Sequence, residues 1–194
     1  WYILDCPEGA SLVVGHNAGS RQELQEMIEQ ERWGELIREI PVKKGDFIQI
    51  NPGTVHAIKG GLMILETQQN SDITYRVYDY GRLTDGKPRQ LHLKQSMDVI
   101  VCPHQVHNTQ GPSENHGAYE TCTLVESGYF TVDRWNVKTE VSIAQNYPFM
   151  LMDVTAGKGT LNGAAVKAGD HLLVPAGCRT VDARGELELV TTHI

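Results

Sequence analysis

The features that this sequence lacks already argue against several classes of protein. Its 194 residues include 17 Lys and Arg against 24 Asp and Glu, and a formal net charge of −7 with no basic cluster argues against a nucleic-acid-binding surface. No apolar run approaches the roughly 20 residues of a membrane-spanning helix. We therefore expect neither a nucleic-acid nor a membrane partner, and the oligomeric state stays open.

Cysteine is scarce as well. Cys6, Cys102, Cys122 and Cys178 form no C-x-x-C pair and have no zinc-ribbon spacing, which argues against a disulfide scaffold. We interpret them as reduced, mostly buried thiols of a cytoplasmic protein. A starting methionine and a signal-peptide pattern are also missing, since the chain opens in a strand-like run at Trp1. We expect a fragment that begins inside a domain.

Short apolar runs separated by Gly- and Pro-containing turns dominate the chain and predict a mainly β protein. In Asn51-Pro52-Gly53, proline fixes φ and glycine is free to adopt a positive φ, which predicts a turn. Residues 74–80 are predicted to form a strand. Because alternate side chains of a strand share a face, Arg76 would lie on the same face as Thr74, Tyr78 and Tyr80. Residues 94–100 predict a short helix.

The hydrophobic period changes to that of a helix between about residues 20 and 40. Ser20-Arg21-Gln22-Glu23 is a capping-box sequence, which predicts a helix start. Two sets of apolar residues follow at helical spacing but out of phase, namely Leu24, Met27 and Ile28, then Trp33, Leu36, Ile37 and Ile40. We therefore predict two short helices, inserted in a β domain.

A Lys-x-Gly-Asp phrase followed by a strand, a turn and a glycine occurs twice. Residues 42–53 parallel residues 166–177, and His56 aligns with Thr180. Two β-barrels of one type, with the histidine only in the first, explain this repeat. We predict a first barrel at 1–102 that contains the helical insertion, a linker at 103–117, and a second, degenerate barrel at 118–194.

The predicted linker has a composition of its own. Pro, Asn, Gln, Ser and Gly predominate there without periodicity, and it contains His104, His107 and His116. Since no strand or helix is predicted to fix these three imidazoles, we interpret them as loop residues and not as metal ligands.

The first copy of the repeat, with Gly45-Asp46, Pro52-Gly53 and His56, resembles the second motif of the cupin barrels, which have a jelly-roll fold. The longer runs GTVHAI, LETQQNSD and TYRVYDYGR, within residues 53–82, are similar to type I mannose-6-phosphate isomerase, in the short form found in many Firmicutes. This resemblance covers nearly the whole chain. It implies a zinc-dependent enzyme that acts on a phosphorylated hexose.

The resemblance also implies roles for four residues. His56 falls on a zinc ligand, Glu66 on an acidic residue of the active site, Arg76 on the catalytic arginine, and Arg82 on a basic, substrate-binding position. The family's other zinc ligands fall upstream of Trp1, so we expect the chain to be inactive by itself.

The residue types suit this chemistry. Interconversion of mannose 6-phosphate and fructose 6-phosphate moves a proton between C1 and C2 through an enediol, which needs a base and a Lewis acid or cation. Zinc on His56 would polarise the sugar oxygens, and a buried carboxylate such as Glu66 could move the proton. Arg76 and Arg82 suit an enediolate or a phosphate. The identity of the base stays open.

Other interpretations also fit the residues. A non-catalytic sugar-binding or regulatory cupin is one alternative, and an iron-dependent oxidising cupin is another, although only one histidine is visible in the motifs. His56 could be a structural histidine and Arg76 half of an ordinary salt bridge. Asp72 and Asp79 are interpreted as turn and surface residues without a catalytic role.

Overall fold

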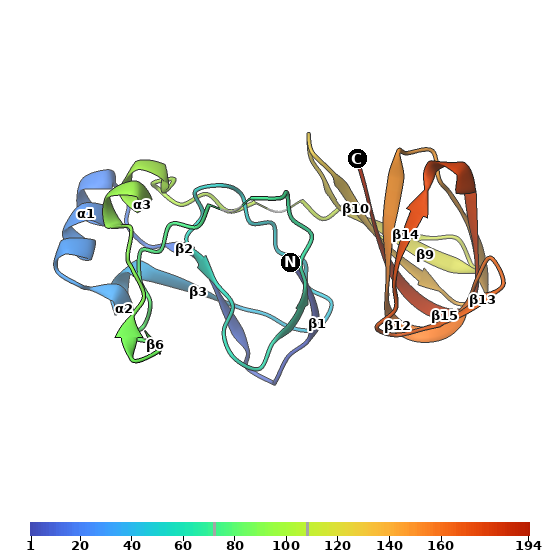
Figure 1. Ribbon diagram of the computed structural model, residues 1–194, viewed down its shortest axis with the longest axis horizontal. Helices are drawn as coiled ribbons and strands as arrows, with labels where there is room; N and C mark the ends of the chain where they lie inside the picture. Colours follow the sequence, from blue (N-terminus) through green and yellow to red (C-terminus); the bar gives the residue numbers. More distant parts are fainter. Residues whose placement is uncertain (72, 108) are drawn as a thin grey trace. The chain divides into compact units, whose positions relative to one another are not determined.

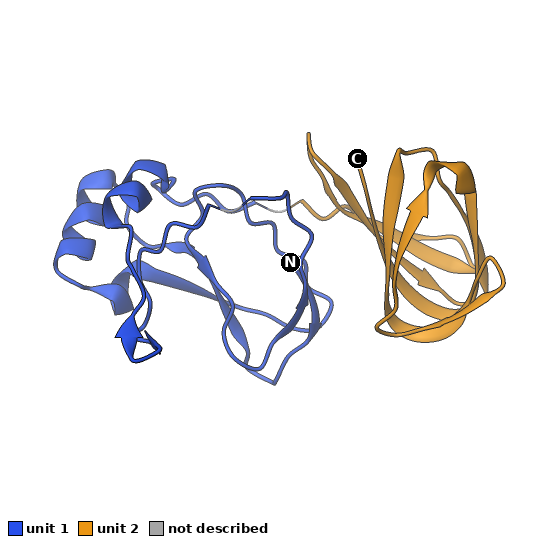
Figure 2. Cartoon of the chain, viewed as in Figure 1, with its two compact units in different colours: residues 1–107 blue, residues 108–194 orange. Residues whose placement is uncertain are grey.

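The computed structural model describes residues 1–71, 73–107 and 109–194, so Asp72 lies outside the described residues. The chain divides into unit 1, residues 1–107, and unit 2, residues 108–194, coloured blue and orange in Figure 2. Strand residues outnumber helical residues in both, and the prediction of a mainly β protein is confirmed (Figure 1).

The described part of unit 1 contains three small antiparallel sheets. Their strands are β1 (Tyr2–Asp5) with β5 (Met63–Leu65); β2 (Ser11–His16) between β3 (Ile37–Pro41) and β4 (His56–Ala57); and β6 (Leu83–Thr84) with β7 (Lys87–Pro88). Buried side chains of β1 and β2, including Ile3 and Leu12, form one core. Because these sheets are separate and short, the prediction of a first barrel in this half, without its N-terminal strands, is not confirmed.

Three helices cover a second core of unit 1. They are α1 (Arg21–Glu29), α2 (Trp33–Leu36) and α3 (Leu93–Val99), and α1 and α3 lie side by side in Figure 1. The capping box is formed, since the Ser20 side chain accepts from the Glu23 backbone N–H at 3.2 Å. None of the described helices is long and apolar enough to cross a membrane.

The second predicted helix is wrong in its C-terminal half. Helix α2 ends after one turn at Leu36, and Ile37 to Pro41 form strand β3 instead. In this strand Ile37 pairs with His16 and Ile40 with Leu12. Pairing with β2 therefore overrides the helical spacing of these β-branched residues.

Unit 2 is one eight-stranded antiparallel sheet. Its strands are β8 (Glu114–Asn115), β9 (Tyr119–Glu126), β10 (Thr131–Val137), β11 (Glu140–Ala144), β12 (Phe149–Leu161), β13 (Ala164–Lys167), β14 (His171–Pro175) and β15 (Thr180–His193). A 3₁₀ turn, η1 (Ala176–Cys178), separates the last two. The long strands β12 and β15 pair from Met150 to Leu161 and from Ala183 to His193, and residues such as Met152 and Leu189 are fully buried.

The sequence repeat has the same hydrogen bonds in both units. Asp46 accepts from the Lys43 backbone N–H at 2.8 Å, and Asp170 accepts from that of Lys167 at 2.8 Å. Within each turn the glycine has a positive φ, 89° at Gly45 and 93° at Gly169, as the turn requires. The repeat in sequence is therefore also a repeat in backbone geometry.

Candidate active site

His56 stands on strand β4, directly after the predicted turn. The turn is confirmed: Gly53 has φ 81°, and its carbonyl accepts from the Val101 backbone N–H at 3.0 Å. A Cβ atom at Gly53 would lie 2.5 Å from the Val99 carbonyl oxygen, so only glycine fits here. Pairing of His56 with Val14 of β2 then fixes the strand that carries the imidazole.

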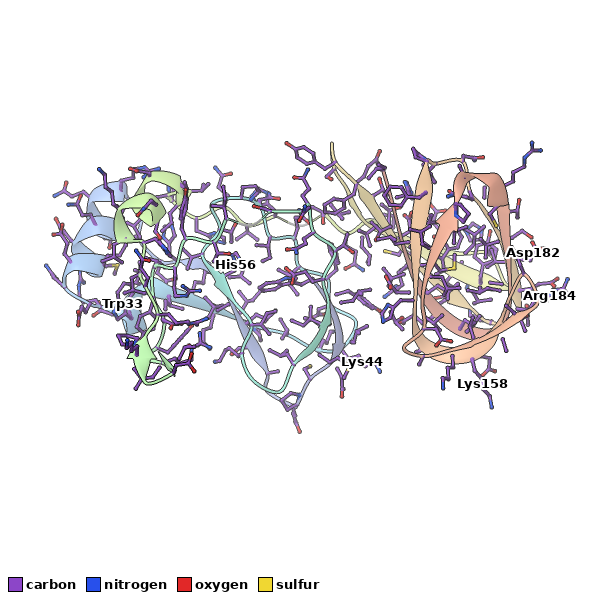
Figure 3. The ribbon with its side chains drawn as sticks, viewed as in Figure 1. Trp33, Lys44, His56, Lys158, Asp182 and Arg184 are labelled. Carbon is purple, nitrogen blue, oxygen red and sulfur yellow. The ribbon has the colours of Figure 1, made fainter. Side chains whose placement is uncertain are left out.

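One hydrogen bond determines which imidazole nitrogen of His56 is available. Nδ1 lies 2.7 Å from the Thr54 carbonyl oxygen. Because a carbonyl can only accept, Nδ1 carries the proton and Nε2 keeps its lone pair. The His56 side chain is exposed in unit 1 (Figure 3). A carbonyl that orients one nitrogen while the other is accessible is the usual arrangement of a metal-ligating histidine.

The Trp1 indole connects His56 with Glu66. Its ring lies edge-on to the His56 ring, with centroids 5.4 Å apart, and its Nε1–H donates to Glu66 Oε1 at 2.9 Å. Glu66 follows strand β5 and is exposed, so the expectation of a buried carboxylate is wrong. The strand ends before the charged side chain, which leaves the carboxylate at the surface with one oxygen oriented by the indole.

The segment of Arg76 is not a strand. Among residues 73–80 none is in a strand, and the chain turns back at Asp79, where the Arg82 N–H donates to the Asp79 carbonyl at 3.0 Å. Tyr80 has φ 54°, a left-handed conformation that no strand accommodates. The alternating pattern is instead explained by aromatic stacking, since the Tyr78 ring lies 4.6 Å from the Trp33 ring at 15°.

Three arginine side chains surround the carboxylate of Asp79. Arg89 binds its carboxylate with Nε at 2.8 Å from Oδ2 and a second bond from Nη2 to Oδ1. Arg82 donates to Oδ1 at 3.1 Å, and the Nε atom of Arg76 lies 3.9 Å from the same oxygen. Asp79 is 6% exposed, and the hydrogen bonds from Arg89 hold its pKa below the ordinary value although burial opposes this shift.

The predicted site residues thus form two groups in unit 1. Trp1 links His56 to Glu66, and Asp79 links Arg76 to Arg82. Within the described residues, no hydrogen bond or ion pair joins one group to the other.

Sequence reasoning missed Asp79 and Arg89. The interpretation of Asp79 as a surface residue is wrong, because it is buried among guanidinium groups. A carboxylate with three arginines in 14 residues is a charge pattern that could have suggested the cluster.

Arg82 and Arg89 also line a cavity of about 810 Å³ in unit 1. Its other walls come from the helices and the aromatic pair, and include Ile28, Trp33, Tyr78 and Met97. The cavity is therefore lined by both apolar and charged side chains, the two arginines among them.

The donor atoms present partly fit a metal ion. His56 offers an oriented imidazole nitrogen, and the Trp1 indole that contacts this imidazole also donates to a Glu66 oxygen. Across the described ranges, however, no three His, Cys, Asp or Glu side chains group closely enough to hold a metal. His56 is thus suited to be one ligand of a larger donor set. His104, His107 and His116 belong to no such group either.

Comparison with known proteins finds similarity to mannose-6-phosphate isomerases in both units. Residues 120–194 match the family model described as the cupin domain of mannose-6-phosphate isomerase. The whole chain is 44% identical to the mannose-6-phosphate isomerase ManA of Bacillus subtilis and 42% identical to the mannose-6-phosphate isomerase of Streptococcus mutans. It spans 63% and 62% of the lengths of these two proteins, respectively.

Solved structures agree with this relationship. The crystal structure of the Bacillus subtilis mannose 6-phosphate isomerase matches the whole chain with a TM-score of 0.95 at 39% identity, over 63% of that protein. The isomerase of Salmonella typhimurium, 15% identical, shares the fold over 89% of this chain with a TM-score of 0.63. The chain is therefore similar to mannose-6-phosphate isomerases throughout its length, and residues 120–194 match the model of their cupin domain.

Proposed function

We propose that the full-length protein is an isomerase that interconverts mannose 6-phosphate and fructose 6-phosphate. The observation that carries this proposal is the 44% identity to a mannose-6-phosphate isomerase along the entire chain. An aldose–ketose isomerase needs a group that moves a proton between C1 and C2 and cationic groups beside the oxygens that become negative. Unit 1 offers side chains of both types.

We infer that zinc is the cofactor and that His56 is one of its ligands. Support comes from the Thr54 carbonyl, which orients the imidazole so that Nε2 can coordinate a metal. A catalytic zinc has three protein ligands, so residues 1–194 alone are expected to be inactive. When bound, zinc supplies a Lewis acid that polarises the sugar oxygens.

Glu66 is assigned the proton transfer. Its carboxylate lies in the same group as His56, and the bond from Trp1 Nε1 holds Oε1 in place. A carboxylate oriented in this way is suited to accept a proton from the substrate carbon.

We assign to Arg76 and Arg82 the stabilisation of the negative charges on the substrate and the transition state. The Arg76 guanidinium donates to the Gln90 carbonyl at 3.2 Å, which fixes its direction and leaves further N–H groups for an enediolate oxygen. Arg82, 60% exposed, is suited to the substrate phosphate, because a guanidinium pairs with two oxygens at once.

We also propose that unit 1 is the first of two cupin barrels, completed in the full-length protein. The shared turn geometry of the two repeats supports this proposal, since a duplicated barrel accounts for identical hydrogen bonds at equivalent positions.

The test is an isomerisation assay on the full-length protein before and after metal removal. We expect conversion of mannose 6-phosphate to fructose 6-phosphate, loss of that activity with a chelator, and recovery with zinc. Absence of conversion in the metal-replete protein contradicts the isomerase proposal. Conversion that survives complete metal removal contradicts the zinc proposal alone.

A further inference from the structure

One arginine of the cluster around Asp79, Arg89, has no role in the proposed reaction. Arg89 lies on the segment after β7 and makes the only two-point contact of the described residues with the Asp79 carboxylate. Arg82 makes a single side-chain bond to that carboxylate, and Arg76 approaches it without reaching hydrogen-bond distance. The three guanidinium groups therefore share one buried charge unequally.

The segment that carries Arg89 also holds the backbone of Arg76. The Arg76 N–H donates to His92 Nδ1 at 3.1 Å, and the His92 N–H donates to the Arg76 carbonyl at 2.8 Å. The Gln90 carbonyl accepts from the Arg76 guanidinium. Residues 89–92 thus fix the position of Arg76 at several points that do not involve Asp79.

We propose that Arg89 is a positioning residue that keeps the Asp79 carboxylate from capturing the Arg76 guanidinium. This inference rests on the proposed function, in which Arg76 acts on the substrate. With both carboxylate oxygens bound by the Arg89 fork, Asp79 attracts Arg76 only weakly, and the Arg76 N–H groups stay directed at the site.

Removal of Arg89 changes this balance. The buried Asp79 carboxylate then keeps one side-chain bond, from Arg82 to Oδ1, and its Oδ2 loses its partner, which is unfavourable for a buried charge. Arg82 already donates to Oδ1, so the next cation that can approach is the Arg76 guanidinium, whose Nε lies 3.9 Å from Oδ1. A shift of about 1 Å would complete a hydrogen bond and displace Arg76 from the substrate.

The test is a pair of variants of the full-length protein assayed by steady-state kinetics. Because a misplacement of about 1 Å can cost on the order of 10²-fold, we expect Arg89→Ala to lower kcat by about that factor, with a much smaller change in KM. Adding Asp79→Asn to Arg89→Ala removes the competing charge, while Gln90 and His92 still hold Arg76. We expect the double variant to recover at least about tenfold in kcat over Arg89→Ala.

A purely structural role of Arg89 gives a different result. Losing both members of a stabilising pair would leave the double variant no more active than Arg89→Ala, and that result overturns the proposal, as does a wild-type kcat in Arg89→Ala. Arg184→Ala is the matched control, since Arg184 lies exposed in unit 2 with one ion pair to Glu140 (Figure 3).

A milder substitution covers the case in which Arg89→Ala does not fold. Arg89→Gln keeps much of the side chain and an N–H donor without the charge, and the same reversal by Asp79→Asn is expected there. Wild-type protein without isomerase activity contradicts the proposed function instead, so the two failures are distinguishable.

Discussion

The two copies of the repeat share a backbone but differ in the side chains that could react. In unit 1 His56 pairs with Val14, and the Gly15 N–H donates to the Val55 carbonyl at 2.7 Å. In unit 2 Thr180 pairs with Ala144, and the Gln145 N–H donates to the Arg179 carbonyl at 2.7 Å. The position of the imidazole in one unit is thus occupied by a hydroxyl in the other.

The acidic position differs in the same way. Glu66 stands two residues after Ile64, the partner of Ile3. In unit 2, Thr191 stands two residues after Leu189, the partner of Val154.

In both units an indole N–H donates to this position. Trp1 donates to Glu66, and Trp135 donates to the Thr191 hydroxyl at 3.0 Å. The exposed carboxylate of unit 1 corresponds to a buried neutral hydroxyl in unit 2, which is 1% exposed. The comparison teaches that the turn and the strand pairing can be kept while both reactive groups are replaced.

Substitution at the imidazole position should give the largest difference between the two units in zinc content and kcat. His56→Ala should remove zinc from the full-length protein and lower kcat by about 10³-fold or more, since a Lewis acid supplies several kcal/mol. Thr180→Ala, the equivalent change, should leave zinc content and kcat unchanged. Metal analysis and kinetics on both variants measure this. Full zinc retention with normal turnover in His56→Ala would remove the role of this residue.

A second prediction compares one arginine from each unit. If Arg76 stabilises developing charge, Arg76→Ala should lower kcat by about 10²-fold with a smaller rise in KM. Arg76→Lys should recover little, because an ammonium group cannot reproduce the planar fork. Arg134→Ala on β10 loses a bond to Ser113 in unit 2 and should leave kcat unchanged. Near-normal kcat with a large loss of thermal stability would make Arg76 a structural residue.

A structural feature could be predicted from the sequence where neighbouring residues alone determine it. The Ser20 cap and the Gly53 turn need only nearby residues, and both predictions are confirmed. Ile37 was misassigned because a partner strand far along the chain outweighs its helical spacing.

The candidate site followed the same rule. The cluster around Asp79 depends on Arg89, which the turn at β6 and β7 returns to the carboxylate. The charge pattern could suggest such a cluster, but periodicity does not indicate which arginine binds Asp79. The residue roles themselves rest on the family resemblance and stay predictions.

A third prediction concerns the glycine that ends each repeat. Gly53→Ala places a Cβ atom 2.5 Å from the Val99 carbonyl at a positive φ and should destabilise the protein by about 2 kcal/mol or more. Gly177 lies in η1 without a positive φ, and a Cβ atom there would meet no atom of the described residues within 4 Å. Gly177→Ala should therefore change stability by less than about 0.5 kcal/mol. Denaturant unfolding measures both, and equal losses would contradict the difference.

The smallest expected effect is the difference in stability loss between equivalent substitutions in the turn that both units share. Asp46→Ala and Asp170→Ala each remove a carboxylate that accepts from a backbone N–H at 2.8 Å, and each should cost about 1–2 kcal/mol. Both aspartates are half-buried, so the two losses should agree within about 0.5 kcal/mol.

The matched controls are Asp46→Asn and Asp170→Asn, whose amide oxygens still accept the bond and whose losses should be smaller. If unit 1 only resembles unit 2 in sequence, its turn is free to relax, and Asp46→Ala would cost far less than Asp170→Ala. Equal losses in denaturant unfolding, with zinc content unaffected in both variants, support one barrel type in which the turn is structural and only the histidine position distinguishes a reactive copy from an inert one.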